Sequence, residues 1–163
     1  MDNRKEIIVG GELQVAVIMG SESDRETMEV CLAQLEKLGV KSELKVSSAH
    51  RMPEATKAYI EEAIERGAKV FIAGAGMSAA LPGFVASVTT KPVIGVPIPS
   101  GLPGGMDALL SMVQMPPGIP VATVAVGKAG AKNAAVLATE ILSLVEDRFS
   151  KELDKMRDQW KSR

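Results

Sequence analysis

Short apolar runs recur along the chain and are separated by segments in which apolar residues return every three or four positions. The run Leu13–Met19 is almost continuously apolar, which is typical of a parallel strand covered on both faces. Glu43–Ser47 is flanked by polar residues, which favours a place near the edge of a sheet. The pattern predicts five strands, at Leu13–Met19, Glu43–Ser47, Val70–Ala73, Val93–Pro97 and Val121–Val126.

A helical segment follows each predicted strand. The first opens with Ser23 and Glu26, which fit the capping box S-x-x-E, and Gly39 ends it. Pro53 suits the first turn of the second helix, and Gly67 ends that helix. Later helices are predicted at about residues 81–88, 106–114 and 129–145. Strands that alternate with helices over short links predict an α/β fold, a flavodoxin-like three-layer αβα sandwich with a five-stranded parallel sheet.

Sheets of this kind bind ligands beyond the carboxyl ends of their strands, where the strand order reverses. We therefore expect the loops that follow the first four strands to meet in one cleft. These loops are Gly20–Asp24, Ser47–Arg51, Gly74–Ala80 and Pro97–Gly105.

The C-terminal stretch, residues 146–163, is highly charged but carries one narrow apolar stripe. Phe149, Leu153, Met156 and Trp160 make up this stripe, at the spacing of one face of a helix. Our preferred interpretation is a helix that packs on a neighbouring subunit. The same spacing also fits an ordinary surface helix that packs on its own chain.

The composition narrows the function classes. The chain of 163 residues has a net charge of -1, with 46% hydrophobic and 24% charged residues, as in ordinary soluble domains. Lys and Arg form no basic face, so we expect no binding of long nucleic acid. No apolar run approaches the roughly 20 residues of a membrane span, and the charged start is unlike a secretory signal, so we expect a cytoplasmic location and no membrane partner.

Two residue classes are scarce. Cys31 is the single cysteine, which excludes an internal disulfide. Aromatic residues make up only 3% of the chain, which argues against the stacked ring of a flavin site. Gly and Ala are abundant instead, and such small residues suit closely packed backbones and large subunit interfaces.

The turn Gly20–Asp24 offers several groups to an anionic ligand. A helix N-terminus presents free backbone N–H groups and a positive dipole end, and the hydroxyls of Ser21 and Ser23 add donors. Asp24 would repel a phosphate but suits ribose hydroxyls. Simple helix capping by Ser23 explains the same residues equally well. The turn matches neither a Walker A loop nor G-x-G-x-x-G, so a triphosphate or dinucleotide site is not indicated.

Ser48, Ala49, His50 and Arg51 follow the second predicted strand. His50 is the single histidine, and an imidazole can both give and take a proton near neutral pH, although a lone histidine is more often structural. Arg51 offers a planar, bidentate donor to phosphate or carboxylate. A single histidine without a cluster of Cys or carboxylates predicts that the chain holds no metal.

Gly74, Ala75 and Gly76 begin a predicted loop with almost no side-chain chemistry. Such a loop would present bare backbone N–H groups and a small apolar chamber to a flat ring or a released small molecule. Tight packing of a strand against a helix is the alternative.

Taken together and in this order, several segments resemble the PurE family of purine biosynthesis. They are VAVIMGSESD, SSAHR, AGAGMSAALPGFVAS, PVIGVP, MDALLSMVQMPPGIPVATVAVG and KAGAKNAAVLATEIL, and they span about Val15 to Leu142. The resemblance is strongest to the class I branch, whose enzymes move a carboxylate from the exocyclic nitrogen to ring carbon C4 of an aminoimidazole ribonucleotide. It implies this activity here, on a small-molecule ribonucleotide, with no ATP, metal or organic cofactor and with assembly as an octamer.

The resemblance also implies residue roles. His50 matches the family's catalytic histidine, and Ser21, Asp24 and Arg51 match its substrate-binding positions. We infer in addition that Ser21, Ser23 and Arg51 hold the phosphate and that Asp24 holds the ribose. The expected substrate site comprises Ser21, Ser23, Asp24, Ser48, Ala49, Arg51, Gly74, Ala75 and Gly76.

One segment departs from the family pattern. Many class I members read AGAGGAAHLPG where this chain reads AGAGMSAALPG. Ala80 thus replaces the usual histidine and removes a donor near the substrate's carboxylate, while Met77 narrows the chamber. Two alternatives stay open, a direct aminoimidazole ribonucleotide carboxylase that uses CO2 and a PurE-like nucleotide-binding protein without catalysis.

The pattern of strands and helices sets the expected domain bounds. The α/β domain should span residues 13–145, followed by the helix of residues 146–163. Residues 1–12 fall outside the match, and disorder is one interpretation of this N-terminal extension.

Overall fold

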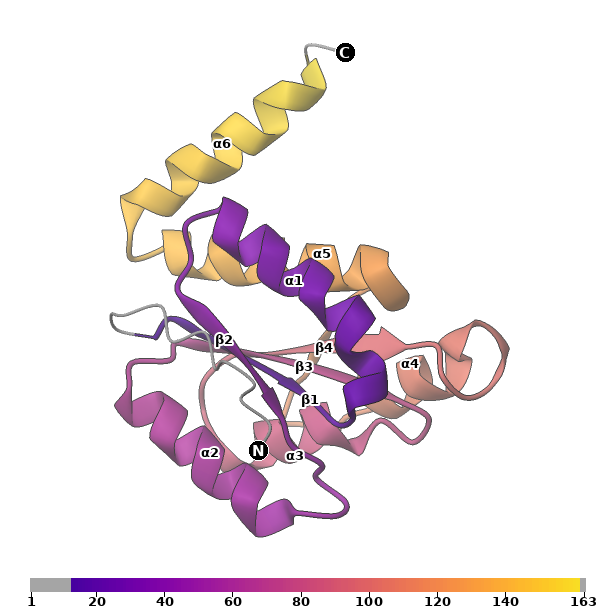
Figure 1. The fold of residues 1–163 in the computed structure, drawn as a ribbon. Coiled ribbons are helices and arrows are strands. Elements are labelled where there is room, and N and C mark those ends of the chain that lie inside the picture. Colours follow the sequence, from indigo (N-terminus) through magenta and orange to yellow (C-terminus); the bar gives the residue numbers. More distant parts are fainter. Residues whose placement is uncertain (1–12, 162–163) are drawn as a thin grey trace, which may run out of the picture.

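Five parallel strands form a single sheet in a computed structural model of the chain, which describes residues 13–161 (Figure 1). The strands are β1 (Val15–Met19), β2 (Ser42–Val46), β3 (Val70–Gly76), β4 (Val93–Ile98) and β5 (Ala122–Thr123). Their order across the sheet is β2-β1-β3-β4-β5, and every neighbouring pair is parallel. The strand order therefore reverses between β1 and β3. The predicted extension, residues 1–12, lies outside the described part of the chain.

Helices cover both faces of this sheet (Figure 1). They are α1 (Arg25–Lys37), α2 (Pro53–Glu65), α3 (Ala80–Val88), α4 (Met106–Val113), α5 (Gly127–Ser143) and α6 (Asp147–Lys161). Helices α1 and α5 pack on one face with the start of α6, and α2, α3 and α4 pack on the other. Two 3-10 turns, η1 (Glu22–Asp24) and η2 (Pro103–Gly105), precede α1 and α4. This arrangement confirms the predicted flavodoxin-like three-layer sandwich.

The alternating side chains of β1 contribute to both halves of the core. Val15, Val17 and Met19 belong to the cluster with α1 and α5, whereas Ala16 and Ile18 belong to the cluster with α2 and α3. All five side chains are fully buried. Burial on both faces explains why this run is continuously apolar in the sequence.

The two edge strands differ in how well the sequence predicts them. Strand β2 lies at one edge and is only partly buried, as its polar flanks predicted. Strand β5 lies at the other edge and pairs with β4 only through Ala122 and Thr123, so the predicted strand Val121–Val126 is too long. The chain makes one further bond, from the N–H of Val124 to the carbonyl of Gly95, and then turns into α5.

Strand β3 includes Gly74, Ala75 and Gly76, which the sequence analysis placed in a loop. That prediction is wrong because Ala75 and Gly76 still pair with β4, opposite Pro97 and Ile98. Gly74 is needed within the strand, since a Cβ there would lie 2.3 Å from the Sδ of Met28 on α1. The glycine therefore marks the close approach of a helix rather than the end of a strand.

Helix α1 begins at Arg25, after the 3-10 turn, and not at Ser23. Ser21 caps the turn, because its Oγ accepts from the N–H of Ser23 at 3.3 Å. The predicted capping box is therefore wrong. Its second member, Glu26, instead accepts a hydrogen bond from Lys128 at the start of α5.

Helix α6 confirms the predicted C-terminal helix, and the first half of its apolar stripe packs on the same chain. Phe149 and Leu153 are buried in the cluster with α1 and α5, and the Nε2 of Gln34 on α1 donates to the Sδ of Met156 at 3.5 Å. Trp160, further along, is 61% exposed. Figure 1 shows α6 extending away from the sandwich. Packing on its own chain thus accounts for the first half of the stripe, while packing of the second half on a neighbouring subunit stays a prediction.

Candidate active site

A single arginine joins two loops at the carboxyl end of the sheet. Arg51, after β2, donates from Nη2 to the carbonyl of Gly20, after β1, at 3.3 Å. Its Nε donates to the Oγ of Ser48 at 3.4 Å, and the same oxygen accepts from the backbone N–H of Arg51 at 3.3 Å. The first two of the four predicted loops therefore lie in contact.

The turn after β1 brings its polar side chains together. The Oγ of Ser23 donates to the Oγ of Ser21 at 3.0 Å and lies 3.3 Å from the Oδ1 of Asp24. Asp24 is only 5% exposed, and this burial raises the pKa of its carboxyl above the ordinary value of 3.8, although hydrogen bonds from Ser23 and from the backbone of Ser21 act in the opposite direction. A carboxylate in this position can accept hydrogen bonds from ligand hydroxyls.

His50 lies in a tight turn between β2 and α2. The N–H of Met52 donates to the carbonyl of Ser48 at 2.8 Å and closes the turn, with Ala49 half-buried inside it. The imidazole is exposed, and within residues 13–161 it has no hydrogen-bond partner. A ring in this state can exchange a proton with a ligand at the carboxyl edge of the sheet.

The end of β3 contributes backbone to this edge and touches the loop after β4. A Cβ on Gly76 would lie 1.8 Å from the Oγ of Ser100, so the missing side chain leaves room for that serine. Met77 and Ala79 follow with positive φ values of 53° and 32°, and Met77 is 62% exposed. Ala80, where the family pattern has a histidine, is the first residue of α3.

Two side chains outside the predicted set of site residues also lie here, Ser100 in the loop after β4 and Asp107 in the first turn of α4. The Oδ2 of Asp107 accepts from the N–H of Leu102 at 3.0 Å and holds the loop, while its buried Oδ1 has no hydrogen-bond partner among the described residues. Gly101 makes this approach possible, because a Cβ there would lie 2.0 Å from Oδ2. The sequence shows that Asp107 is an acidic residue in the first turn of a predicted helix. The spacing does not show that its carboxylate accepts a hydrogen bond from Leu102 in the preceding loop.

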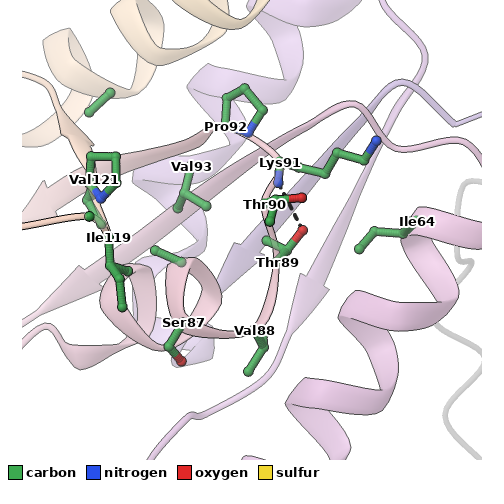
Figure 2. Close-up of a pocket in the computed structure, with 14 residues that line it drawn as sticks. Ile64, Ser87, Val88, Thr89, Thr90, Lys91, Pro92, Val93, Ile119 and Val121 are labelled. Atoms are coloured by element: carbon green, nitrogen blue, oxygen red, sulfur yellow. Dashed lines mark hydrogen bonds between the residues drawn. The ribbon is translucent and has the colours of Figure 1, made fainter.

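A cavity of about 1090 Å³ lies at the other end of the strands, where β4 and β5 begin (Figure 2). Ile64, Val93, Ile119 and Val121 contribute to its mostly apolar lining. It contains none of the predicted site residues. The cavity is therefore separate from the edge that carries His50.

Two further features are absent from residues 13–161, a metal-binding cluster and a helix that could span a membrane. No group of three or more His, Cys, Asp or Glu side chains in this range could hold a metal ion. None of the helices described there combines the length and apolarity that a bilayer span requires.

A family model described as AIR carboxylase matches residues 14–163, almost the whole chain. The chain belongs to this family. The AIR carboxylase fold is also seen in solved relatives: the structure of Treponema denticola PurE matches with a TM-score of 0.80 and 29% identity, over 91% of this chain and 92% of that one. The predicted resemblance to the PurE family is thereby confirmed.

Curated relatives within the AIR carboxylase family are considerably more similar in sequence. An N5-carboxyaminoimidazole ribonucleotide mutase of Bacillus subtilis (strain 168) is 54% identical over 147 residues, which cover 90% of this chain and 91% of that protein. A mutase of the same name from Saccharolobus solfataricus is 53% identical over 149 residues, covering 89% and 93%. These mutases agree with the predicted class I branch.

Proposed function

We propose that this chain is an N5-carboxyaminoimidazole ribonucleotide mutase of purine biosynthesis. The observation that carries the proposal is the identity of about half of all residues to mutases over nine tenths of the chain. The loops at the carboxyl edge of the sheet fit this activity, because they supply one imidazole, one guanidinium and one buried carboxyl beside bare backbone. The relatives support the mutase rather than the direct carboxylase.

The turn after β1 and Arg51 would hold the nucleotide. Ser21, Ser23 and the guanidinium of Arg51 supply donors on the phosphate side, and Asp24 accepts from the ribose hydroxyls. The contact of Arg51 with Gly20 supports this division, because it places the cation beside the turn that carries the two serines. Ser48 and Ala49 belong to the same site, since Ser48 bonds Arg51 from within the His50 turn.

His50 would transfer one proton in each of two steps, first as a donor and then as an acceptor. As the carbamate loses CO2, the protonated ring donates to the exocyclic nitrogen, which becomes an amine. Ring carbon C4 then attacks the retained CO2 and gives up its hydrogen to the now neutral imidazole. The protonated ring is restored, so the cycle balances with no other reactant.

The retained CO2 needs a small chamber, which the backbone of the strand end Gly74, Ala75 and Gly76 would line. The space of the two missing glycine side chains is itself filled by Met28 and Ser100. Its backbone lies at the carboxyl edge between β1 and β4. Ala80 provides no hydrogen-bond donor in this chain, so the carboxylate would be held by backbone groups and by His50. The role of Gly74, Ala75 and Gly76 in the substrate site stays a proposal.

We also propose that the enzyme works as an octamer in the cytoplasm. The imidazole of His50 is exposed in the single chain, whereas the proposed reaction must retain CO2 and exclude water. Large exposed apolar side chains such as Leu102, Met106 and Leu110, on the loop after β4 and on α4, are suited to a subunit contact. A neighbouring subunit that covers the loops would provide the missing enclosure.

A coupled assay with two substrates tests the activity. The N-carboxylated nucleotide should give 4-carboxy-5-aminoimidazole ribonucleotide at substoichiometric enzyme, and aminoimidazole ribonucleotide with bicarbonate should react far more slowly. His50→Asn should abolish turnover while the affinity for the nucleotide stays within roughly tenfold, since the ring transfers protons. Turnover only with aminoimidazole ribonucleotide and CO2 would identify a carboxylase, and binding without turnover would identify a binding protein.

A further inference from the structure

A buried hydroxyl braces the turn that carries His50. Thr56, on the first turns of α2, is fully buried, and its Oγ1 donates to the carbonyl of Met52 at 2.9 Å. The same oxygen lies 2.7 Å from the Oγ of Ser47, which is also buried. Ser47 directly precedes the Ser48–Met52 turn that carries His50, and Met52 is the last residue of this turn. One hydroxyl therefore connects both ends of the turn.

The proton positions in this network follow from its chemistry. A carbonyl only accepts, so the one hydroxyl proton of Thr56 is used by Met52. The Oγ of Ser47 must then donate to the Oγ1 of Thr56. The backbone N–H of Ser47 donates to the carbonyl of Met19 at 2.8 Å. A continuous set of bonds thus runs from the end of β1 through Ser47 and Thr56 to Met52.

The bracing matters because the position of the ring depends on the turn that carries it. Within residues 13–161 the imidazole of His50 has no hydrogen bond of its own. Its position depends on the backbone of the turn, which is closed by the bond from Met52 to Ser48 and by the network around Thr56. Pre-organisation of a reactive side chain of this kind requires support from residues that do not touch the ligand.

We propose that Thr56 is a positioning residue for His50. Its hydroxyl fixes the Ser48–Met52 turn, so that the imidazole reaches the exocyclic nitrogen and C4 in one geometry. This inference rests on the proposed function and on the role of His50 in it. Thr56 itself contacts no substrate and acts through the turn.

The substitution Thr56→Val removes the hydroxyl and keeps the shape of the side chain. A displacement of about 1 Å can lower a rate by about a hundredfold. Because the backbone bonds from Met52 to Ser48 and from Ser47 to Met19 remain, we expect kcat to fall by about tenfold. KM for the nucleotide should change much less than kcat, since the side chain of Arg51 stays bonded to the carbonyl of Gly20 and the turn after β1 is unchanged. Thr56→Ser should restore most of kcat, and Ser47→Ala should lower kcat in the same direction as Thr56→Val.

Thr139 provides a matched control. It is also fully buried, and its Oγ1 donates to the carbonyl of Ala135 at 2.7 Å within α5. Thr139→Val and Thr56→Val should both lower the unfolding temperature, but only Thr56→Val should lower kcat. An unchanged kcat in Thr56→Val, or an equal loss in Thr139→Val, would overturn the proposal.

A second measurement does not depend on turnover. His50 is the single histidine, so the ring signal of protein labelled with 13C-histidine belongs to this residue without assignment. Thr56→Val should shift or broaden this signal, whereas Thr139→Val should leave it unchanged. An unchanged ring signal in Thr56→Val would overturn the positioning role. Absence of turnover in the unmodified protein would instead contradict the proposed function, and the ring signal would still decide the role of Thr56.

Discussion

Arg51 spans the loops after β1 and β2 and retains unused donors. Its guanidinium has five N–H groups, and two nitrogens bond to Gly20 and Ser48. The side chain is exposed, so its remaining N–H groups are available to an anion. A residue that is fixed on one side and open on the other is suited to bind phosphate in a defined orientation.

Removal of this cation should weaken substrate binding more than chemistry. We expect Arg51→Ala to raise KM for the nucleotide by roughly 10- to 100-fold, because a charge-assisted hydrogen bond is worth about 1.5–3 kcal/mol. The change in kcat should be much smaller, and steady-state kinetics separates the two. Arg157→Ala on α6, which removes an arginine bonded to Glu140, is the control and should leave KM unchanged. An unchanged KM in Arg51→Ala would show that the phosphate binds elsewhere.

The buried carboxyl of Asp24 should lower the free energy of unfolding at neutral pH, where it is ionised. Because burial raises the pKa of its carboxyl, the folded chain binds the proton more tightly than the unfolded chain. The resulting stabilisation is complete below the unfolded pKa near 3.8 and is lost as the pH rises through the raised folded value. Asp24→Asn should therefore raise the free energy of unfolding at neutral pH and lose this advantage in acid.

Urea unfolding at neutral pH and below about pH 4 measures this difference. Asp147→Asn, which changes an exposed carboxylate in the first turn of α6, should bring no such gain. The same Asp24→Asn protein should also bind the nucleotide more weakly if the carboxylate accepts from ribose hydroxyls. A loss of stability at neutral pH would contradict the argument from burial.

At the scale of elements, the hydrophobic pattern predicts which segments are strands and helices better than it predicts where they end. Leu13–Met19 is unambiguous because both faces of β1 are buried, and Leu13 itself precedes the strand by only two positions. Gly74 and Gly76 misled the prediction, because a glycine that accommodates Met28 or Ser100 looks the same in sequence as one that ends a strand. Tertiary packing decides between the two, and a single sequence does not contain that information.

The same limit applies to the candidate site. His50, Arg51 and the turn after β1 could be found from residue type and position at strand ends. Ser100 and Thr56 could not, because their partners are Gly76 in one case and Ser47 in the other, and these contacts depend on how loops and helices pack. Chemically reactive side chains are thus predictable here, while the residues that support them are visible only in three dimensions.

Helix α5 lies unusually close to the chain that precedes it, and this makes a sharp prediction possible. A Cβ on Gly130 would lie 1.5 Å from the carbonyl oxygen of Ala125, so backbone would have to move. By helix propensity alone, Gly130→Ala should stabilise the helix by about 1 kcal/mol. We expect the clash to prevail and to lower the free energy of unfolding by roughly 3 kcal/mol.

Chemical unfolding of Gly130→Ala measures the sign directly. Gly20→Ala is the matched control, because no atom lies within 4 Å of a Cβ at that position. It should change stability by less than about 0.5 kcal/mol. A stabilised Gly130→Ala protein would contradict the clash with the carbonyl of Ala125.

At the scale of the whole molecule, the junction of α5 and α6 determines where the C-terminal helix points. Glu146 accepts hydrogen bonds from Lys69 at 2.9 Å and from Arg148 at 3.1 Å, and Gln14 beside β1 donates to the same carboxylate at 3.1 Å. Arg148 also donates to the carbonyl of Gly39 at 3.1 Å. The start of α6 is thereby tied to the sheet, and its distal half is held away from the sandwich in a fixed direction (Figure 1).

That direction leaves Trp160 as an apolar side chain with no place in the core of its own chain. Deletion of the whole helix would be a poor test of subunit contact, because it would also remove Phe149 and Leu153 from the core. Trp160→Glu is more selective, since it changes only the exposed end of the stripe. Lys151→Glu, on the same helix but outside the stripe, is the control for added negative charge.

We expect Trp160→Glu to weaken assembly while each chain stays folded, because a buried aromatic contact between subunits would be replaced by a charge. Light scattering should show a smaller particle for Trp160→Glu and an unchanged particle for Lys151→Glu, and circular dichroism should be the same for both. Trp160 is the single tryptophan, so its fluorescence gives a second readout. Dilution of the unmodified protein through its dissociation range should shift this emission to the red as the ring meets water. An intact assembly in Trp160→Glu would assign the distal half of α6 to solvent and leave the subunit contacts to other surfaces.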